Sequence, residues 1–392
     1  MALTKAEVNE RYYETVAGKI VFRTEGQQYL HPLAVAKLLA AQARTRETRA
    51  LKILELGAND CAFAMSLLKL LAALAANGEV ELERIDYFAV ELARGALQAF
   101  FDGVQETGDF QRATPGAPAS PLVGSLTRLG TPQVNVHLVH ADAVAFVGGG
   151  SGGYDAVIVN ELLDDLPGRA FYADAQGNRR ELEAHAEQEG DGWKVTVTAA
   201  ETPEPALADM PPSTLTATSA ESLAIVRGAG EQLVSGGMLI VHDYGFADRY
   251  TPLADYEAAP TSIPEYVELE FPPGSEAGFP RAFFRVFGND EARVVQITSD
   301  VAFGELAEAL APHGRVIVLP HGNAMIAQRE PDDLRRGDGI FLSEFALLEP
   351  GDDLHTMLER LEGEEDELRR RYFDDYLEGR RTVFSNLLFV KT

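Results

Sequence analysis

The chain has 392 residues, enough for one elaborated α/β domain or for two domains. Its formal net charge is −27, from 61 acidic and 34 basic residues. This charge argues against a nucleic-acid-binding surface, because binding to phosphates needs basic patches. The acidity permits a basic protein partner or a cationic substrate, although solubility is the simpler explanation. The N-terminus lacks the apolar core of a signal peptide and no apolar run reaches membrane-spanning length, so we expect no membrane partner.

Two helices are expected ahead of the first strand. Residues 4–16 have helical periodicity, and residues 31–46 have it more strongly, with His31 and Pro32 at the start. The polar stretch between them, Thr24–His31, is interpreted either as a cover for a ligand crevice or as an ordinary loop. We expect residues 1–50 to form an N-terminal helical cap.

The next stretch predicts a buried strand, Leu51–Leu56, that runs into a turn at Gly57. Its near-continuous apolar run is typical of a central parallel strand that is covered on both faces. A helix is expected from Cys61 to about Leu74, and its N-terminus would face the crevice where open α/β sheets bind ligands. A dinucleotide fingerprint needs three glycines at this turn, and Gly57 is the one present, so NAD and FAD are poor candidates.

Glu55 and Gly57, in the order Glu-Leu-Gly, resemble the first motif of class I S-adenosylmethionine (SAM) methyltransferases. The resemblance implies that Glu55, Gly57 and Asn59 hold the amino acid moiety of SAM; the alternative is a generic strand, turn and helix. Cys61 is the single cysteine, so an intrachain disulfide is impossible, which suits a reducing, cytoplasmic setting. A thiol at a helix start can be acidified, but a small buried residue is the favoured interpretation.

Acidic residues follow the next two strands. The strand Ile85–Val90 ends at Glu91, whose carboxylate can accept hydrogen bonds from both ribose hydroxyls; a solvated acid is the alternative. After the strand Val134–Val139 comes Asp142, which by the same resemblance faces the adenine amino group, with Ala143 beside it. His140 is interpreted as a surface or structural residue. The intervening elements are a helix at Ala93–Gln105, a long loop or insertion at 107–132 and a flexible connector at Gly148–Gly153.

The fourth strand, Tyr154–Val159, runs directly into a polar cluster of Asn160, Glu161 and Asp164. Methyl acceptors bind at this position in the fold class that the first motif resembles. Carboxylates only accept hydrogen bonds, so they suit a guanidinium or an amine, which only donates. The alternative is a helix N-cap, which explains one or two of these residues but not all three.

An appended substrate-side element and a fifth strand are expected next. The predicted elements are antiparallel strands at Arg169–Ala173 and Trp193–Val197, a helix at Ser219–Leu233 ended by Gly236 and Gly237, and a strand at Met238–Val241. His242–Gly245, which contains Asp243 and Tyr244, would follow that strand. If so, Asp243 and Tyr244 converge with the cluster after the fourth strand, because adjacent strands lie about 4.8 Å apart.

The C-terminal part alternates strands and helices. We expect strands at Phe283–Phe287, Ala292–Ile297, Arg315–Leu319 and Val383–Val390, an amphipathic helix at Val301–Leu310 and a charged, solvated outer helix at about 352–378. The expected domains are the cap, a SAM-binding core at 51–250 with insertions at 107–132 and 168–215, and a substrate-side α/β region at 251–392.

Four stretches together resemble the MidA-like methyltransferases; they are Ile53–Gly57, Val159–Pro167, Gly236–Gly245 and Gln296–Leu306. The resemblance covers roughly residues 28–320, and its more specific parts are Asn-Glu-x-x-Asp-x-x-Pro and Asp-Tyr-Gly. It implies a class I SAM-methyltransferase fold, a Rossmann-like doubly wound α/β sheet with an added, mostly antiparallel substrate region. Studied members of that family assist the assembly of respiratory complex I by methylating a protein arginine. The first motif here is poorer in glycine than is usual in the family.

The sequence therefore predicts a SAM-dependent methyltransferase that N-methylates a basic, arginine-like acceptor on a protein. The residues expected at the reacting end are Asn160, Glu161, Asp164, Asp243 and Tyr244, with Asn160 also touching SAM. The alternatives are O-methylation of a small molecule and a non-catalytic assembly factor that kept the fold. An oxidoreductase is disfavoured by the missing glycines, no metal is expected, and the oligomeric state is open.

Overall fold

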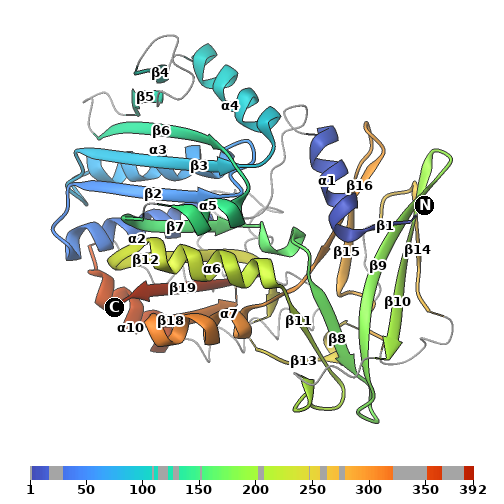
Figure 1. Cartoon of the computed structure of the whole chain (residues 1–392). Helices are drawn as coiled ribbons and strands as arrows, with labels where there is room; N and C mark the ends of the chain where they lie inside the picture. The colour runs from blue at the N-terminus through green and yellow to red at the C-terminus, as the bar shows by residue number, and fades with distance from the viewer. Residues whose placement is uncertain are drawn as a thin grey trace, which may run out of the picture. The chain divides into compact units, whose positions relative to one another are not determined.

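The structure is a computed structural model that describes residues 2–16, 30–107, 110–113, 122–126, 132–150, 152–201, 207–246, 248–256, 263–272, 279–320, 351–363 and 384–392. It divides into two compact units, each built from three segments (Figure 1). Unit 1 contains Met1–Val16, Leu163–Leu223 and Tyr244–Leu306, and unit 2 contains Ala17–Leu162, Ala224–Asp243 and Ala307–Thr392. The units are interleaved along the chain, whereas the division expected from the sequence was into three consecutive parts.

Unit 2 is organised around a parallel sheet (Figure 1). Its parallel strands are β2 (Ala50–Leu56), β3 (Arg84–Glu91), β6 (Gln133–His140), β7 (Tyr154–Asn160) and β12 (Leu233–Phe246), the last of which continues into unit 1. Their order is β6-β3-β2-β7-β12. Counted in chain order this is 3-2-1-4-5, the doubly wound arrangement, and the order reverses between β2 and β7. Because ligands bind at such a reversal, the carboxyl ends of β2 and β7 define the candidate site.

Antiparallel strands complete both edges of this sheet. β19 (Phe384–Lys391) lies between β12 and β18 (Gly314–Pro320) and runs antiparallel to β18, which confirms both predicted C-terminal strands. At the other edge, β5 (Leu122–Ser125) pairs antiparallel with β6, and β4 (Phe110–Arg112) pairs with β5. The prediction of a long loop at 107–132 is therefore wrong where these short strands form, because they extend an edge that the sequence pattern did not reveal.

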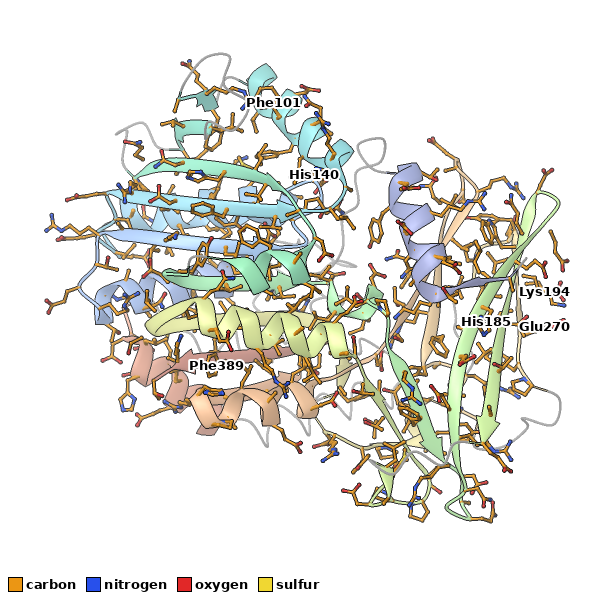
Figure 2. All side chains as sticks on the ribbon, in the orientation of Figure 1. Phe101, His140, His185, Lys194, Glu270 and Phe389 are labelled. Atoms are coloured by element: carbon orange, nitrogen blue, oxygen red, sulfur yellow. The ribbon has the colours of Figure 1, made fainter. Side chains whose placement is uncertain are left out.

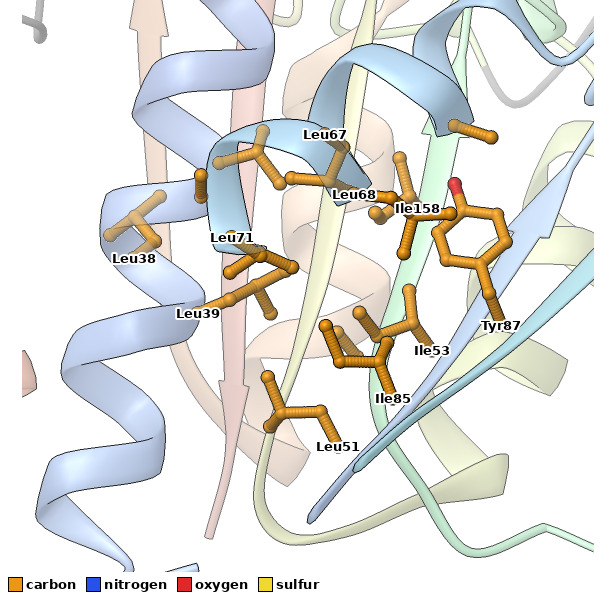
Figure 3. Packing of buried hydrophobic residues seen from close by; sticks show 14 of the residues in the cluster. Leu38, Leu39, Leu51, Ile53, Leu67, Leu68, Leu71, Ile85, Tyr87 and Ile158 are labelled. Atoms are coloured by element: carbon orange, nitrogen blue, oxygen red, sulfur yellow. The ribbon is translucent and has the colours of Figure 1, made fainter. Parts of the chain in front are cut away.

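The helices α2, α3, α4 and α10 contribute to one apolar core with the strands of the sheet. Figure 3 shows Leu39 of α2 and Leu71 of α3 packed with Leu51, Ile53 and Ile85 of the strands. The helices that unit 2 contributes are α2 (Leu30–Thr45), α3 (Ala62–Ala76), α4 (Arg94–Thr107), α5 (Ala143–Gly149), α6 (Ala220–Gln232, shared with unit 1) and α10 (Leu354–Gly363). The start of α10 corrects one expectation: its residues Leu354, Met357 and Leu358 are buried in the same core, so this turn is not a solvated outer helix. The rest of the predicted helix lies outside the described residues.

The glycine pair before the fifth strand has a different role from the one predicted. α6 already ends at Gln232, and β12 begins at Leu233 and includes Gly236 and Gly237. The register with β7 shifts between Leu233 and Met238, so the glycines lie in a bulge inside the strand. Gly236 has a φ of +72°, a conformation that L-residues adopt at a cost, and this explains glycine here without a helix end. β12 also continues through His242–Gly245, which the sequence placed beyond the strand.

Unit 1 is a second, mostly antiparallel structure. Its larger sheet has the order β13-β11-β8-β9-β10-β14, with β1 on β9, and its smaller sheet pairs β15 with β16. The strands are β1 (Leu3–Thr4), β8 (Arg169–Ala173), β9 (Arg179–Glu189), β10 (Gly192–Glu201), β11 (Thr214–Thr218), β13 (Thr251–Pro252), β14 (Val267–Glu270), β15 (Phe284–Asn289), β16 (Val294–Ser299) and β17 (Val301–Ala302). β8 and β10 both belong to antiparallel pairs, as predicted, but each pairs with β9, so the two run parallel to each other. The sequence analysis missed β9 because its polar residues hide the alternation.

An ion pair and the helices α1 and α7 are further features of unit 1, and α7 is shared with unit 2. Lys194 of β10 and Glu270 of β14 form an ion pair of 2.8 Å, visible in Figure 2. The helix α1 (Lys5–Val16), predicted at 4–16, packs on β16. The amphipathic helix is confirmed as α7 (Phe303–Leu310), and two residues of its predicted range form β17 instead. Among the helices that the structure describes, none is long and apolar enough to cross a membrane.

Candidate functional site

The turn after β2 is folded tightly onto the end of β3. The amides of Gly57 and Ala58 both donate to the carbonyl of Val90, at 2.9 and 3.0 Å. Gly57 has a φ of +73°, and a β-carbon there would lie 3.1 Å from the side chain of Leu162. Leu162 follows β7, so the two strand ends at the reversal meet over Gly57. An L-residue would be strained at this φ, and its β-carbon would require the Leu162 side chain to shift by a few tenths of an ångström, so glycine suits this position.

Three non-glycine residues in the two strand-end segments have left-handed backbones. They are Asn59 (φ 46°) and Cys61 (φ 58°) after β2, and Glu161 (φ 49°) after β7. Such conformations cost free energy and concentrate at functional sites. Cys61 itself is fully buried, and burial raises the pKa of its thiol well above the ordinary value. This confirms the interpretation of Cys61 as a small buried residue.

Glu91 lies where the sequence places it, at the end of β3. One carboxylate oxygen accepts a hydrogen bond from the backbone amide of Asn59 at 2.8 Å, and the other accepts one from the backbone amide of Ala93 at 2.7 Å. Burial raises the pKa of Glu91, while these backbone hydrogen bonds oppose the rise. Each oxygen keeps a second lone pair. The carboxylate is thus fixed against the turn after β2 and can still accept hydroxyl groups.

Glu55 faces a different environment from the other predicted SAM ligands. It is 2% exposed, and the Tyr87 hydroxyl donates to its carboxyl group at 2.9 Å. Figure 3 shows Tyr87 within the core beside Ile158. Burial raises the pKa of Glu55 to about 8, so the carboxyl group is mostly protonated at neutral pH. In this structure Glu55 connects β2 to β3 beneath the turn.

Asp142 and Ala143 lie at the start of α5. Asp142 is the N-cap of this helix, and its carboxylate accepts the Ala145 amide at 2.8 Å. Ala143 is the first helical residue. His140, labelled in Figure 2, contacts the Leu92 carbonyl through Nε2 at 2.9 Å, in agreement with a structural role. The second oxygen of Asp142 has no hydrogen-bond partner among the described residues, and Asp142 is exposed.

Asn160 and Glu161 meet the fifth strand at the end of β7. Asn160 is opposite His242 in the β7–β12 ladder, and the Glu161 amide donates to the His242 carbonyl at 2.8 Å. The Leu162 amide donates to Asp243 at 3.1 Å, and Asp243 is fully buried. The structure therefore brings Asn160, Glu161 and Asp243 together, with Asp243 holding the backbone after β7.

Asn160 carries an unusual buried atom. The residue is 7% exposed, and its side-chain oxygen has no hydrogen-bond partner among the described residues. An orphaned buried acceptor costs about 1–3 kcal/mol unless a ligand or water satisfies it. This oxygen suits the ammonium group of an amino acid moiety, and Glu91 suits ribose hydroxyls. The residues present thus fit SAM, whose amino acid and ribose groups carry these donors.

Asp164 and Tyr244 belong to unit 1. Asp164 is 3% exposed, and its backbone carbonyl accepts the Lys5 ammonium group. Tyr244 lies beside Phe287, with ring centroids 6.2 Å apart, and the guanidinium carbon of Arg285 is 4.7 Å from its ring.

Two buried clusters were missed in the sequence. In unit 1, Asp165 accepts from the Tyr13 hydroxyl, from Gln296 at 2.8 Å and from Asn9 at 3.1 Å, and so connects α1 and β16. In unit 2, the buried His242 ring stacks on His31 at 4.1 Å. The only sequence signal was that Asp165 and His242 adjoin motif residues; their partners lie far away in the chain.

The comparisons with known proteins agree with this geometry. A family model described as "Putative S-adenosyl-L-methionine-dependent methyltransferase" matches residues 34–261, more than half of the chain. A crystal structure of an uncharacterized protein from Burkholderia thailandensis has a TM-score of 0.50 at 17% identity, covering 100% of this chain and 87% of that one. A protein of the same superfamily and organism, solved with S-adenosyl-homocysteine bound, has a TM-score of 0.47 at 18% identity, covering 99% and 78%. Among curated proteins, no sequence matches this chain.

These findings confirm the predicted fold class and cofactor. The first structural similarity shows the fold, and the sheet of unit 2 has the Rossmann-like order that the class I resemblance implied. The family match makes SAM the methyl donor and removes the oxidoreductase alternative. The chain belongs to this family of S-adenosyl-L-methionine-dependent methyltransferases.

Proposed function

We propose that the protein N-methylates a basic acceptor, an arginine side chain of a protein by analogy with the MidA-like family. The observation that carries the proposal is the cluster where the segment after β7 meets Asp243 of β12. There Glu161, which is partly exposed, lies next to the backbone that Asp243 fixes. A carboxylate at this point attracts a guanidinium or an amine and repels an acidic acceptor.

SAM would be held by residues of unit 2 in this proposal. The Asn160 oxygen accepts a hydrogen bond from the ammonium group of SAM, and the Glu91 carboxylate accepts hydrogen bonds from the ribose hydroxyls. Asp142 and Ala143, at the start of α5, lie on the adenine side, as the family resemblance implies. Glu55 supports the turn at Gly57 through its hydrogen bond with Tyr87.

SAM supplies a methyl group on a positively charged sulfur. The acceptor nitrogen forms the new N–C bond as the S–C bond breaks, and S-adenosyl-homocysteine leaves. The chain contributes mainly proximity and orientation, because the transfer is a direct displacement. Glu161 accepts the proton that the acceptor nitrogen loses, which makes it the general base of the proposal.

The test is methyl transfer from radiolabelled SAM to a panel of acceptors: an arginine-rich peptide, a lysine-rich peptide, a tyrosine peptide and a carboxylate-rich peptide. We expect label on the basic peptides, and we expect Glu161→Gln to reduce the rate while SAM affinity, measured by calorimetry, stays unchanged. Glu83→Gln is the matched control, because Glu83 is an exposed acid that directly precedes β3 and pairs with Arg49.

Two outcomes would contradict parts of the proposal. Label on the phenol or the carboxylate alone would favour O-methylation and contradict the cationic acceptor. A wild-type rate in Glu161→Gln would remove Glu161 from the reaction.

A further inference from the structure

The fourth family-like stretch, Gln296–Leu306, has no role in the function described so far. In unit 1 it lies against the end of β12. Gly245 pairs with Val301 of β17 in parallel, and Phe246 pairs with Ala302. The stretch is thus joined to the Asp-Tyr-Gly motif, whose central residue is Tyr244.

Gly245 permits this junction. Its φ is +149°, and a β-carbon there would lie 2.2 Å from the Val301 carbonyl oxygen. Such a distance is far inside van der Waals contact, so any side chain would separate the two strands. The glycine of the Asp-Tyr-Gly motif is therefore explained by the close approach of β17, which begins directly after Asp300.

Asp300 holds a buried cation against Tyr244. Its carboxylate forms an ion pair with Arg285, and the two side chains are only 4% and 16% exposed. The Tyr256 hydroxyl donates to the other oxygen of Asp300. The Arg285 guanidinium carbon lies 4.7 Å from the centre of the Tyr244 ring, at the distance of a cation–π contact.

The ring of Tyr244 is restrained by Phe287 as well. Phe287 is two residues from Arg285 on β15, so both side chains point to the same face of the strand. Its ring centroid is 6.2 Å from that of Tyr244, and its exposed fraction is 37%. A planar guanidinium that is paired with a buried carboxylate is a rigid support for the Tyr244 ring. Moving either side chain away would leave the other charge buried without a counter-charge.

We propose that Arg285 and Asp300 are positioning residues that hold Tyr244 in the orientation needed for methyl transfer. The inference rests on the proposed function and on the sequence-based expectation that Tyr244 lies at the reacting end. It assigns a role to the Gln296–Leu306 stretch: this segment delivers Asp300 to Arg285 and lays β17 along the motif that carries Tyr244.

The experiment reads the Tyr244 ring directly. Protein labelled with 3-fluorotyrosine is studied by fluorine NMR, and Tyr244→Phe assigns the Tyr244 signal. Arg285→Lys keeps the charge but removes the planar guanidinium, and Asp300→Asn keeps the shape but removes the counter-charge. Arg293→Lys is the matched control, because Arg293 lies 5.0 Å from the ring of Tyr266 in the same unit.

We expect the Tyr244 signal to shift or broaden in Arg285→Lys and Asp300→Asn but not in Arg293→Lys. With the acceptor peptide that wild type labels best, kcat should fall about 10- to 100-fold, the scale of a misplaced reacting group, while SAM affinity stays within about twofold. A merely structural role would instead lower SAM affinity together with kcat, whereas thermal stability falls in both cases because the buried ion pair is disturbed.

An unchanged Tyr244 signal in both variants overturns the proposal. So does a wild-type kcat in variants whose Tyr244 signal has moved, because the ring orientation would then not matter to transfer. If wild type labels no peptide of the panel, the proposed function fails, and the catalytic role of Arg285 and Asp300 fails with it. The fluorine spectra still decide separately whether Arg285 and Asp300 hold the ring.

Discussion

Replacing Glu91 with glutamine tests the SAM site most directly. The carboxylate now accepts two backbone amides, those of Asn59 at 2.8 Å and Ala93 at 2.7 Å, and would accept ribose hydroxyls with its remaining lone pairs. Glutamine has the same shape, but its NH2 group only donates hydrogen bonds. It would therefore face one of the backbone amides, of Asn59 or Ala93, without accepting from it. Hydrogen bonds to a charged group are worth about 1.5–3 kcal/mol. We therefore expect the Kd for S-adenosyl-homocysteine to rise about 10- to 150-fold.

Part of this loss would come from loosening of the turn that carries Asn59, and a ligand cycle separates the two effects. Calorimetry compares S-adenosyl-homocysteine with its 2′-deoxy analogue on wild type and on Glu91→Gln. If Glu91 binds the hydroxyl, the analogue binds wild type more weakly, and the variant hardly distinguishes the two ligands. The coupling should be about 1 kcal/mol or more.

Strictly additive effects of the two changes would refute the reasoning, because Glu91 would then act on the turn and not on the ribose. Glu83 directly precedes β3, the strand that Glu91 ends. Glu83→Gln should leave the affinities for both ligands unchanged, since Glu83 is exposed and pairs with Arg49.

Three further changes test other parts of the structure. Gly57→Ala places a β-carbon 3.1 Å from Leu162 at a φ of +73°, and we expect calorimetry to show weaker SAM binding and denaturation to show a stability loss of about 1–2 kcal/mol; unchanged values would contradict the close approach of the strand ends. Asp165→Asn replaces one acceptor oxygen by an NH2 donor, which would face donors such as the Tyr13 hydroxyl. Urea denaturation should therefore show that the free energy of unfolding falls by about 1–3 kcal/mol. An unchanged midpoint would mean that the cluster contributes nothing to stability. Glu55→Gln tests a pH dependence: burial raises the pKa of Glu55 from 4.5 to about 8, so between these values the folded state holds a proton that the unfolded state has lost, and stability falls as pH rises. The variant should flatten this fall between pH 5 and 8 in denaturation experiments, and equal slopes for both proteins would argue against a protonated Glu55.

The strands of the parallel sheet were predictable because each appears in the sequence as a nearly continuous run of apolar residues. β7, for example, is buried at every position from Tyr154 to Asn160, and a strand covered on both faces must be nearly all apolar. β9 has no such signature, because its charged residues alternate with small ones at a partly exposed sheet. The bulge at Gly236 was misinterpreted as a helix end, since glycine serves both purposes and the sequence alone does not distinguish them.

The roles of the site residues stay predictions, and the structure shows what each side chain contacts. Glu91 and Asn160 were named from their positions after strands, and the doubly wound order brings those strand ends to one edge. Glu55 was named by the same argument, but its side chain alternates to the core face and meets Tyr87. A one-residue step along a strand reverses the direction of a side chain, so position after a motif does not fix what the side chain contacts.

The sequence by itself determined the local elements, the polar residues at the strand ends and the family. Each of these depends on neighbouring residues, through apolar periodicity, turn chemistry or a short motif. The tertiary structure alone decided that Asp300 pairs with Arg285 and Arg285 lies over Tyr244, that Asp165 is enclosed by α1 and β16, and that the start of α10 is buried. Contacts of this kind join residues far apart in the chain, and they depend on strand register and on which faces pack together, which no single stretch of sequence contains.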